Sequence, residues 1–296
     1  MTAPARPWHG VLVATALPFR DNDLAVDLDR YAEHVAWLAG AGCDGVVPNG
    51  SLGEYQVLTP EERAAVVRTA AQAAPEGCTV MPGVAAYGAL EARRWTEQAG
   101  EAGAPVVMLL PPNAYRADER TVVEHYREVA RAGLPIVAYN NPHDTRVDLT
   151  PELLARLFDE GLIVAVKEFS GDVRRPYRIA ELAPDLDLLV GADDVLLELA
   201  MAGAVGWVAG FPNSLPHQCV ELYRAATGAD PAAAVPAYRR LHPLLRWDSR
   251  PEFVQAIKVS MDAAGRYGGP CRPPRFPLSD EDTKAILTAT AQELTG

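Results

Sequence analysis

The sequence predicts an α/β protein, a (β/α)8 TIM barrel followed by a C-terminal helical domain, from three observations. From Gly10 onward, short apolar runs alternate with amphipathic stretches, which is typical of βα units that form a parallel sheet. Eight such units can be counted, the number that closes a barrel, and an open doubly wound sheet is the alternative. Beyond residue 229 the pattern is helical only. We therefore expect a barrel over residues 1–229 and a helical domain over residues 230–296.

Each expected strand is a short apolar run, often β-branched, and each is followed by a stretch with helical periodicity. The expected strands are 10–16, 45–48, 79–83, 105–110, 135–139, 162–167, 186–190 and 204–209. The expected barrel helices are 28–41, 60–74, 90–102, 119–132, 151–158, 174–182, 195–202 and 218–227, and those of the C-terminal domain are 231–246, 252–264 and 279–294. Thr59 and Thr150 each precede a proline and a glutamate, which predicts capped helix starts.

Composition excludes several classes of partner. The chain is 49% hydrophobic and 22% charged, as expected for an ordinary globular protein, and no apolar run approaches the roughly 18 residues of a membrane-spanning helix. A formal net charge of -12 without clustered cations argues against nucleic acid. The four cysteines are widely spaced and form no C-x-x-C pair, which indicates free thiols in a reducing cytoplasm. We expect a cytoplasmic protein that binds a small molecule.

Lys167 is the residue that points most strongly to chemistry. It ends the apolar segment 161–167, at the carboxyl end of a strand, where barrels carry their active sites. Lysine is scarce, because only Lys258 and Lys284 accompany it among 27 basic residues, and both lie in helical stretches. A desolvated amine has a lowered pKa and can attack a carbonyl to form a Schiff base, which arginine cannot do. The alternative is a lysine whose stem is buried and whose amine reaches solvent.

Other strand ends add groups that suit a carboxylate substrate. The segment 48–54 places two glycines among small residues, so its backbone N–H groups can point at an anion, although a simple turn is the alternative. Tyr139 ends the fifth strand and could relay protons to a carbinolamine, although a packing tyrosine is the alternative. Gly191 and Gly210 follow the last two strands. No G-x-G-x-x-G motif follows a strand, and the six histidines show no paired spacing, so we expect neither a nucleotide nor a metal.

Four motifs carry a resemblance to a known family: Gly-Ser-Leu-Gly-Glu at 50–54, Tyr-Asn-Asn-Pro at 139–142, Val-Lys-Glu at 166–168 and Gly-Ala-Asp-Asp at 191–194. In this order and spacing they resemble the dihydrodipicolinate synthase and N-acetylneuraminate lyase family, from about Gly10 to the C-terminus. The resemblance implies a barrel with a helical C-terminal domain, a homotetramer, and a lysine that forms a Schiff base with a 2-oxo acid without a cofactor. It implies these catalytic residues: Lys167 as the Schiff-base lysine, Tyr139 as the proton relay and Ser51. The substrate-binding residues that we expect with them are Gly50, Leu52, Asn141, His143, Asp144, Gly191 and Val208.

The sequence departs from the synthase at two positions. The synthase has a tyrosine after its fourth strand, lent across a subunit interface, whereas here Asn113 holds that position and Tyr115 is displaced. The synthase also has an arginine five residues after its motif tyrosine, where this chain has Asp144, and Arg146 is out of register. An aspartate there would repel the carboxylate of aspartate semialdehyde that a guanidinium would clamp. Both departures argue against dihydrodipicolinate synthesis.

Further stretches resemble bacterial family members that deaminate 1-pyrroline-4-hydroxy-2-carboxylate to 2,5-dioxopentanoate and ammonia, namely 50–54, 139–142 with 147–149, 171–175, 206–210 and 243–248. That substrate offers one carboxylate and a C2 imine into which Lys167 can exchange, and Tyr139 can assist loss of the C4 hydroxyl. We therefore expect this deamination. The alternatives are 4-hydroxy-tetrahydrodipicolinate synthase, a dehydratase or aldolase of 2-oxo-3-deoxy sugar acids and, outside catalysis, a 2-oxo acid sensor.

Overall fold

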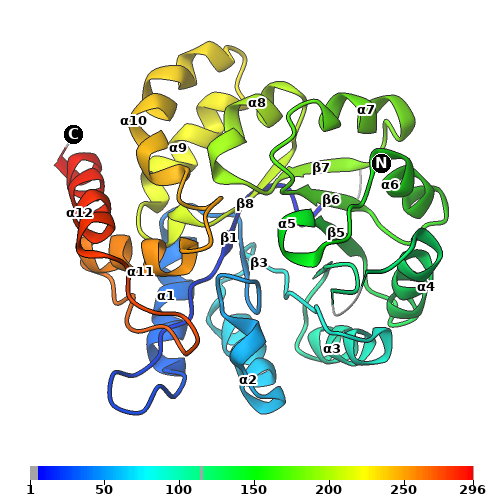
Figure 1. The fold of residues 1–296 in the computed structure, drawn as a ribbon, viewed down its shortest axis with the longest axis horizontal. Coiled ribbons are helices and arrows are strands. Elements are labelled where there is room, and N and C mark those ends of the chain that lie inside the picture. Colours follow the sequence, from blue (N-terminus) through cyan, green and yellow to red (C-terminus); the bar gives the residue numbers. More distant parts are fainter. Residues whose placement is uncertain (1–5, 114–115, 296) are drawn as a thin grey trace.

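The computed structural model describes residues 6–113 and 116–295, and its eight strands are all parallel. In spatial order they run β3-β2-β1-β8-β7-β6-β5-β4. A parallel bridge between Gly83 and Met108 joins the segment after β3 to β4. The strands alternate with helices in the manner of a (β/α)8 barrel (Figure 1). They are β1 (Gly10–Ala14), β2 (Gly45–Val47), β3 (Thr79–Val80), β4 (Val107–Leu109), β5 (Ile136–Asn140), β6 (Ala165–Glu168), β7 (Asp187–Val190) and β8 (Gly206–Ala209).

All eight predicted strands and all eleven predicted helices are present, with bounds that shift by a few residues. The helices of the barrel are α1 (Leu28–Gly40), α2 (Pro60–Ala73), α3 (Ala89–Glu101), α4 (Glu119–Ala130), α5 (Pro142–Thr145), α6 (Pro151–Asp159), α7 (Arg175–Leu182), α8 (Leu196–Met201) and α9 (Pro216–Ala226). Thr59 and Thr150 cap α2 and α6 as predicted, and Glu62 completes a capping box with Thr59. The one-turn helix α5 is not among the predicted helices.

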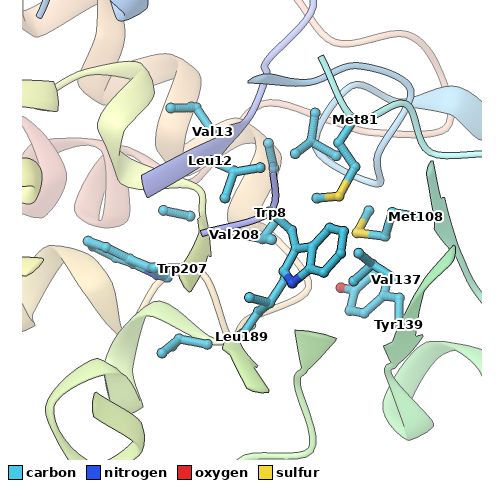
Figure 2. Packing of buried hydrophobic residues seen from close by; sticks show 14 of the residues in the cluster. Trp8, Leu12, Val13, Met81, Met108, Val137, Tyr139, Leu189, Trp207 and Val208 are labelled. Atoms are coloured by element: carbon cyan, nitrogen blue, oxygen red, sulfur yellow. The ribbon is translucent and has the colours of Figure 1, made fainter. Parts of the chain in front are cut away.

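Side chains from alternate strand positions fill the barrel interior. Val137 and Tyr139 lie on the same side of β5, whereas Trp207 and Val208 point to opposite sides of β8 (Figure 2). Trp8 lies at the amino ends of the strands, because its Nε1 donates a hydrogen bond of 2.7 Å to Asp187, the first residue of β7. The interior is thus packed at that end, so any ligand must enter at the carboxyl ends of the strands.

Three helices follow the barrel and lie along one side of it (Figure 1): α10 (Val235–Leu245), α11 (Phe253–Ala263) and α12 (Asp280–Thr295). A buried ion pair ties this region to the loop after β2, because Lys258 Nζ of α11 donates a hydrogen bond of 2.9 Å to Glu54. Both side chains are at most 2% exposed. The loop after β2 is therefore anchored by the C-terminal helices. Among the described residues, no helix is both long enough and apolar enough to cross a membrane.

Candidate active site

A cavity of about 770 Å³ opens at the carboxyl ends of the strands. All but one of the predicted site residues line it: Gly50, Ser51, Leu52, Tyr139, Asn141, His143, Asp144, Lys167 and Val208. Gly191 is the exception, since it lies behind the lysine and outside the cavity lining. A Cβ at Gly191 would lie 3.1 Å from Lys167 Cγ and would collide with the carbonyl oxygen of Glu168. This glycine therefore lets β7 pass close behind Lys167, and its predicted contact with the substrate stays a prediction.

Lys167 and Tyr139 are brought together by the register of the sheet, which pairs them across β5 and β6. Paired residues of parallel strands point to the same side, so both side chains face the interior. Lys167 Nζ lies 4.1 Å from the centre of the Tyr139 ring and 5.7 Å from that of Phe169. The lysine is only 5% exposed, which excludes an amine that reaches solvent.

The surroundings of Lys167 favour its neutral form. Burial lowers the pKa of Lys167 to about 8, and the negative charges of Asp248 and Asp193 oppose that shift. An amine with a pKa of about 8 is roughly one tenth neutral at pH 7, whereas an ordinary lysine is about 0.03% neutral. Neutral amine is the form that attacks a carbonyl, so this position suits a nucleophile.

Tyr139 keeps its proton in this site. Burial raises the pKa of Tyr139 well above its ordinary value, and the charge of Asp248 adds to the effect. Its hydroxyl oxygen accepts a hydrogen bond of 3.3 Å from Asn141 Nδ2, so the phenolic proton is free to be donated to a ligand. Asn141 in turn starts α5, because its Oδ1 accepts a hydrogen bond of 3.2 Å from the backbone N–H of Asp144.

The loop after β2 has the backbone shape of an anion-binding segment. Asn49 and Glu54 both have left-handed backbone angles, with φ of 57° and 52°. Within the described chain, no protein acceptor takes the backbone N–H of Ser51 or Leu52. Glu54 holds the far end of the loop, since it accepts hydrogen bonds from Lys258 and from the backbone N–H of Arg272 at 3.1 Å. The free N–H groups can therefore meet a carboxylate in a fixed geometry.

Two exposed residues of α5 form one side of the cavity mouth. His143 Nε2 lies 3.2 Å from the backbone oxygen of Ser170, and Asp144 Oδ2 accepts a hydrogen bond of 2.9 Å from Asn141. Arg146 follows α5, is exposed and does not line the cavity. The mouth at α5 thus carries a negative charge.

Asn113 lines the cavity on the side of β4. Its Nδ2 donates a hydrogen bond of 3.4 Å to the Tyr55 hydroxyl. Tyr115, the displaced tyrosine of the sequence, lies outside the described residues. An amide therefore stands at the position for which the family resemblance implies a phenol.

Three charged residues that we did not predict also belong to this region: Arg63, Asp193 and Asp248. Arg63 lines the outer cavity, is 7% exposed and lies over the Trp95 ring at 4.4 Å from its centre. Asp193 is fully buried after β7, and Asp248 comes from the loop between α10 and α11. Asp193 follows an apolar strand, the same signal that drew attention to Lys167, and that signal could have identified it. Asp248 follows a predicted helix and carries no such signal.

Among residues 6–113 and 116–295, no group of three or more histidine, cysteine, aspartate or glutamate side chains could hold a metal ion. The four cysteines are free, and burial raises the pKa of Cys43 to about 12. This thiol therefore stays protonated at neutral pH, and it is a poor nucleophile.

Comparisons with known proteins identify relatives over nearly the whole chain. Residues 7–293 match the dihydrodipicolinate synthetase family. The chain is 36% identical, over 98% of its own length and 99% of the relative, to a 4-hydroxy-tetrahydrodipicolinate synthase of Methanothrix thermoacetophila. It is 31% identical to a DapA-like lyase of Halobacterium salinarum that is described as uncharacterized, over 94% of this chain and 91% of that protein.

Solved structures of this family share the fold. The 4-hydroxy-tetrahydrodipicolinate synthase of Methylacidiphilum fumariolicum SolV matches with a TM-score of 0.91 and 27% identity, covering 97% of each chain. A prophage protein of E. coli K12 from the dihydrodipicolinic acid synthase family, solved in complex with pyruvate, matches with a TM-score of 0.90 and 26% identity. That match covers 97% of this chain and 99% of the other.

Proposed function

Because the chain belongs to the dihydrodipicolinate synthetase family, whose members are lyases that form Schiff bases, we propose that Lys167 forms a Schiff base with a small 2-oxo acid or cyclic imino acid. The observation that carries this proposal is the desolvated amine of Lys167 beside the phenol of Tyr139 at the inner end of the cavity. The neutral amine attacks C2 of the substrate to form a carbinolamine. Tyr139 donates a proton to the departing oxygen, water leaves, and an iminium remains on Lys167.

The substrate carboxylate binds to the loop after β2 in this proposal. The backbone N–H groups of Ser51 and Leu52 have no acceptor within the described chain, and the Ser51 hydroxyl lines the same cavity. Three donors suffice to hold one carboxylate without a cationic side chain. This arrangement would direct C2 of the bound acid toward Lys167.

The first candidate reaction is that of 4-hydroxy-tetrahydrodipicolinate synthase, in which pyruvate condenses with aspartate semialdehyde. The names of curated relatives support it. The synthase of Methanothrix thermoacetophila is 36% identical to this chain over 98% of its length. The outer cavity supports it too, because Arg63, Arg250 and Arg275 line it and could pair with the carboxylate of the second substrate.

The second candidate is the deamination of 1-pyrroline-4-hydroxy-2-carboxylate. The observation in its favour is Asp144 at the cavity mouth, together with Arg146, which does not line the cavity. A negative charge at that place disfavours a second anionic group, whereas this substrate has only one carboxylate. The relatives that match the chain are named as synthases and lyases and none as this deaminase, so the deamination stands behind the synthase.

One set of assays separates these candidates. The purified protein is given pyruvate with aspartate semialdehyde, and in parallel the hydroxyproline-derived imine and 3-deoxy-2-oxo sugar acids. Condensation without ammonia release supports the synthase, and ammonia release from the imine supports the deaminase. Water loss or aldol cleavage of a sugar acid would replace both by a dehydratase or aldolase. Binding of pyruvate without turnover of any substrate would indicate a sensor and contradict the lyase proposal.

A further inference from the structure

The charges of two buried carboxylates, Asp193 and Asp248, act on Lys167. In Asp193, both oxygens accept hydrogen bonds. The carboxylate of Asp193 accepts hydrogen bonds from Trp207 Nε1 at 2.9 Å and from the backbone N–H groups of Gly210 and Phe211 at 3.1 and 3.0 Å. Burial raises the pKa of Asp193 to about 6, and these donors oppose that shift. Since its lone pairs are directed at these donors, Asp193 supports the structure and offers little to a ligand.

In Asp248, the second carboxylate, only one oxygen accepts a hydrogen bond from the described residues. Asp248 Oδ2 accepts a hydrogen bond of 3.2 Å from the backbone N–H of Asp193. In the described parts of the chain, no donor reaches its Oδ1. A Cβ at Gly210 would lie 2.8 Å from that oxygen, so the glycine makes room for it. Asp248 is 8% exposed and lines the cavity together with Lys167 and Tyr139.

Asp248 lines the same cavity as Lys167 and Tyr139, the two groups that carry the proposed reaction. Among the charges around Lys167 and around Tyr139, that of Asp248 has the strongest effect on the pKa in both cases. Burial and the charge of Asp193 raise the pKa of Asp248 well above its ordinary value, whereas a positive charge on Lys167 lowers it. An iminium on Lys167 would therefore favour the ionised form of Asp248, and the two charges would attract each other. C3 of a 2-oxo acid is bonded to the iminium carbon, so it would lie in the cavity that Asp248 lines. Tyr139 is a weak base there, because its raised pKa keeps it protonated.

We propose that Asp248 is the base that removes the C3 proton from the Schiff base of a 2-oxo acid, an inference that rests on the proposed function and adds a residue to it. The C3–H bond breaks, its electron pair forms the C2–C3 double bond, and the electrons of the C2–N double bond move to the nitrogen of Lys167. The iminium becomes a neutral enamine, and Asp248 Oδ1 holds the proton. The same carboxyl group returns a proton to C3 when the enamine is quenched.

Two measurements on one variant test this role. In D2O, the enamine step exchanges the methyl protons of pyruvate for deuterium, which proton NMR follows. Borohydride reduction of the protein with pyruvate, followed by peptide mass spectrometry, reports the Schiff base itself. Asp248→Asn keeps an oxygen for the backbone N–H of Asp193 but cannot take a proton. We expect the amount of adduct trapped on Lys167 to stay within about threefold of that in the unaltered protein. The rate of deuterium exchange should fall about 100-fold. Glu252→Gln, an exposed carboxylate of the same loop outside the cavity lining, should leave both unchanged.

Each outcome decides the role of Asp248. Exchange by Asp248→Asn at nearly the rate of the unaltered protein would contradict the proposal. Loss of both trapping and exchange at an unchanged unfolding temperature would also contradict it, because Asp248 would then act before the Schiff base forms. If the unaltered protein neither traps nor exchanges pyruvate and 2-oxobutyrate, the proposed function itself fails.

A second variant covers the case in which Asp248→Asn does not fold. Asp248→Ala leaves a space that formate can enter. Exchange that rises with added formate, and stays constant with the same concentration of chloride, supports a carboxylate base at this position. An exchange rate that does not change when formate is added contradicts it.

Discussion

Lys167 Nζ lies 4.1 Å from the centre of the Tyr139 ring, and the two residues occupy paired positions on neighbouring strands. The pairing is a property of the sheet, so it does not depend on a mobile loop. One side chain can supply a neutral amine at neutral pH, and the other keeps a proton to donate. The chemistry proposed for the site depends on this relationship.

Replacing Tyr139 by phenylalanine should slow the reaction without unfolding the protein. The ring and its packing remain, but no proton reaches the carbinolamine oxygen, so we expect kcat to fall about 100-fold. Steady-state kinetics measure the loss. The matched control is Tyr126→Phe, a buried tyrosine of α4 whose hydroxyl donates a hydrogen bond of 2.9 Å to the backbone oxygen of Leu109. It should lower stability by about 1 kcal/mol and leave kcat unchanged. Equal effects of the two changes would show that the Tyr139 hydroxyl is structural.

The rate of Schiff base formation should depend on pH with a midpoint near 8. The pKa of Lys167 is lowered to about 8 by burial, so acid protonates the amine and removes the nucleophile. Below this pKa the rate of adduct formation with pyruvate should fall about tenfold per pH unit, and above it the rate should level off. Rapid-quench borohydride trapping from pH 6 upward measures the profile. A rate that keeps rising toward pH 10 would mean that Lys167 has the pKa of an ordinary lysine.

The charge at the cavity mouth should influence the choice of the second substrate. Asp144 is an exposed carboxylate on α5, so Asp144→Arg replaces repulsion of an anionic group by attraction. We expect kcat/KM for aspartate semialdehyde to rise about tenfold, while trapping of pyruvate alone stays the same. Asp159→Arg makes the same reversal at the exposed carboxyl end of α6, and should change neither value. An unchanged preference in Asp144→Arg would mean that the second substrate does not approach α5.

The buried pair of Lys258 and Glu54 should stabilise both the fold and the loop after β2. Lys258→Met leaves the buried Glu54 carboxylate with only the longer contact of 3.9 Å to Arg275 Nε, which we expect to cost about 3–5 kcal/mol of the free energy of unfolding. Urea denaturation measures it, with the exposed Lys284→Met as a control expected to stay within about 0.5 kcal/mol. KM for pyruvate should also rise, because the loop carries Ser51 and Leu52. A stable variant with an unchanged KM would disprove the anchoring role.

The sequence predicted the elements of the barrel well, because buried parallel strands are continuous apolar runs and the capped helices between them are long. It also indicated Lys167 and Tyr139, since a strand end is a position that a pattern can locate. The helix α5 was missed because four residues are too few to show a period. The homotetramer, the cytoplasmic location and the domain boundary near residue 229 stay predictions.

The role of Asp248 could not be predicted in the same way. It lies between the predicted helices 231–246 and 252–264, and only the packing of that region over the barrel brings it to the cavity. Arg63 was missed for a related reason. It lies on the buried face of α2, where its guanidinium donates hydrogen bonds to backbone oxygens of the loop after β3. No periodicity shows such a long-range contact.

Borohydride trapping with pyruvate tests the central claim most directly. The protein is reduced in the presence of pyruvate, digested, and its peptides are identified by mass spectrometry, with Lys167→Arg as the charge-conserving control. We predict one reduced adduct, on the peptide that contains Lys167, and none in the variant. An adduct on Lys258 or Lys284, or none on any residue of the unaltered protein, would contradict the claim that Lys167 forms the Schiff base.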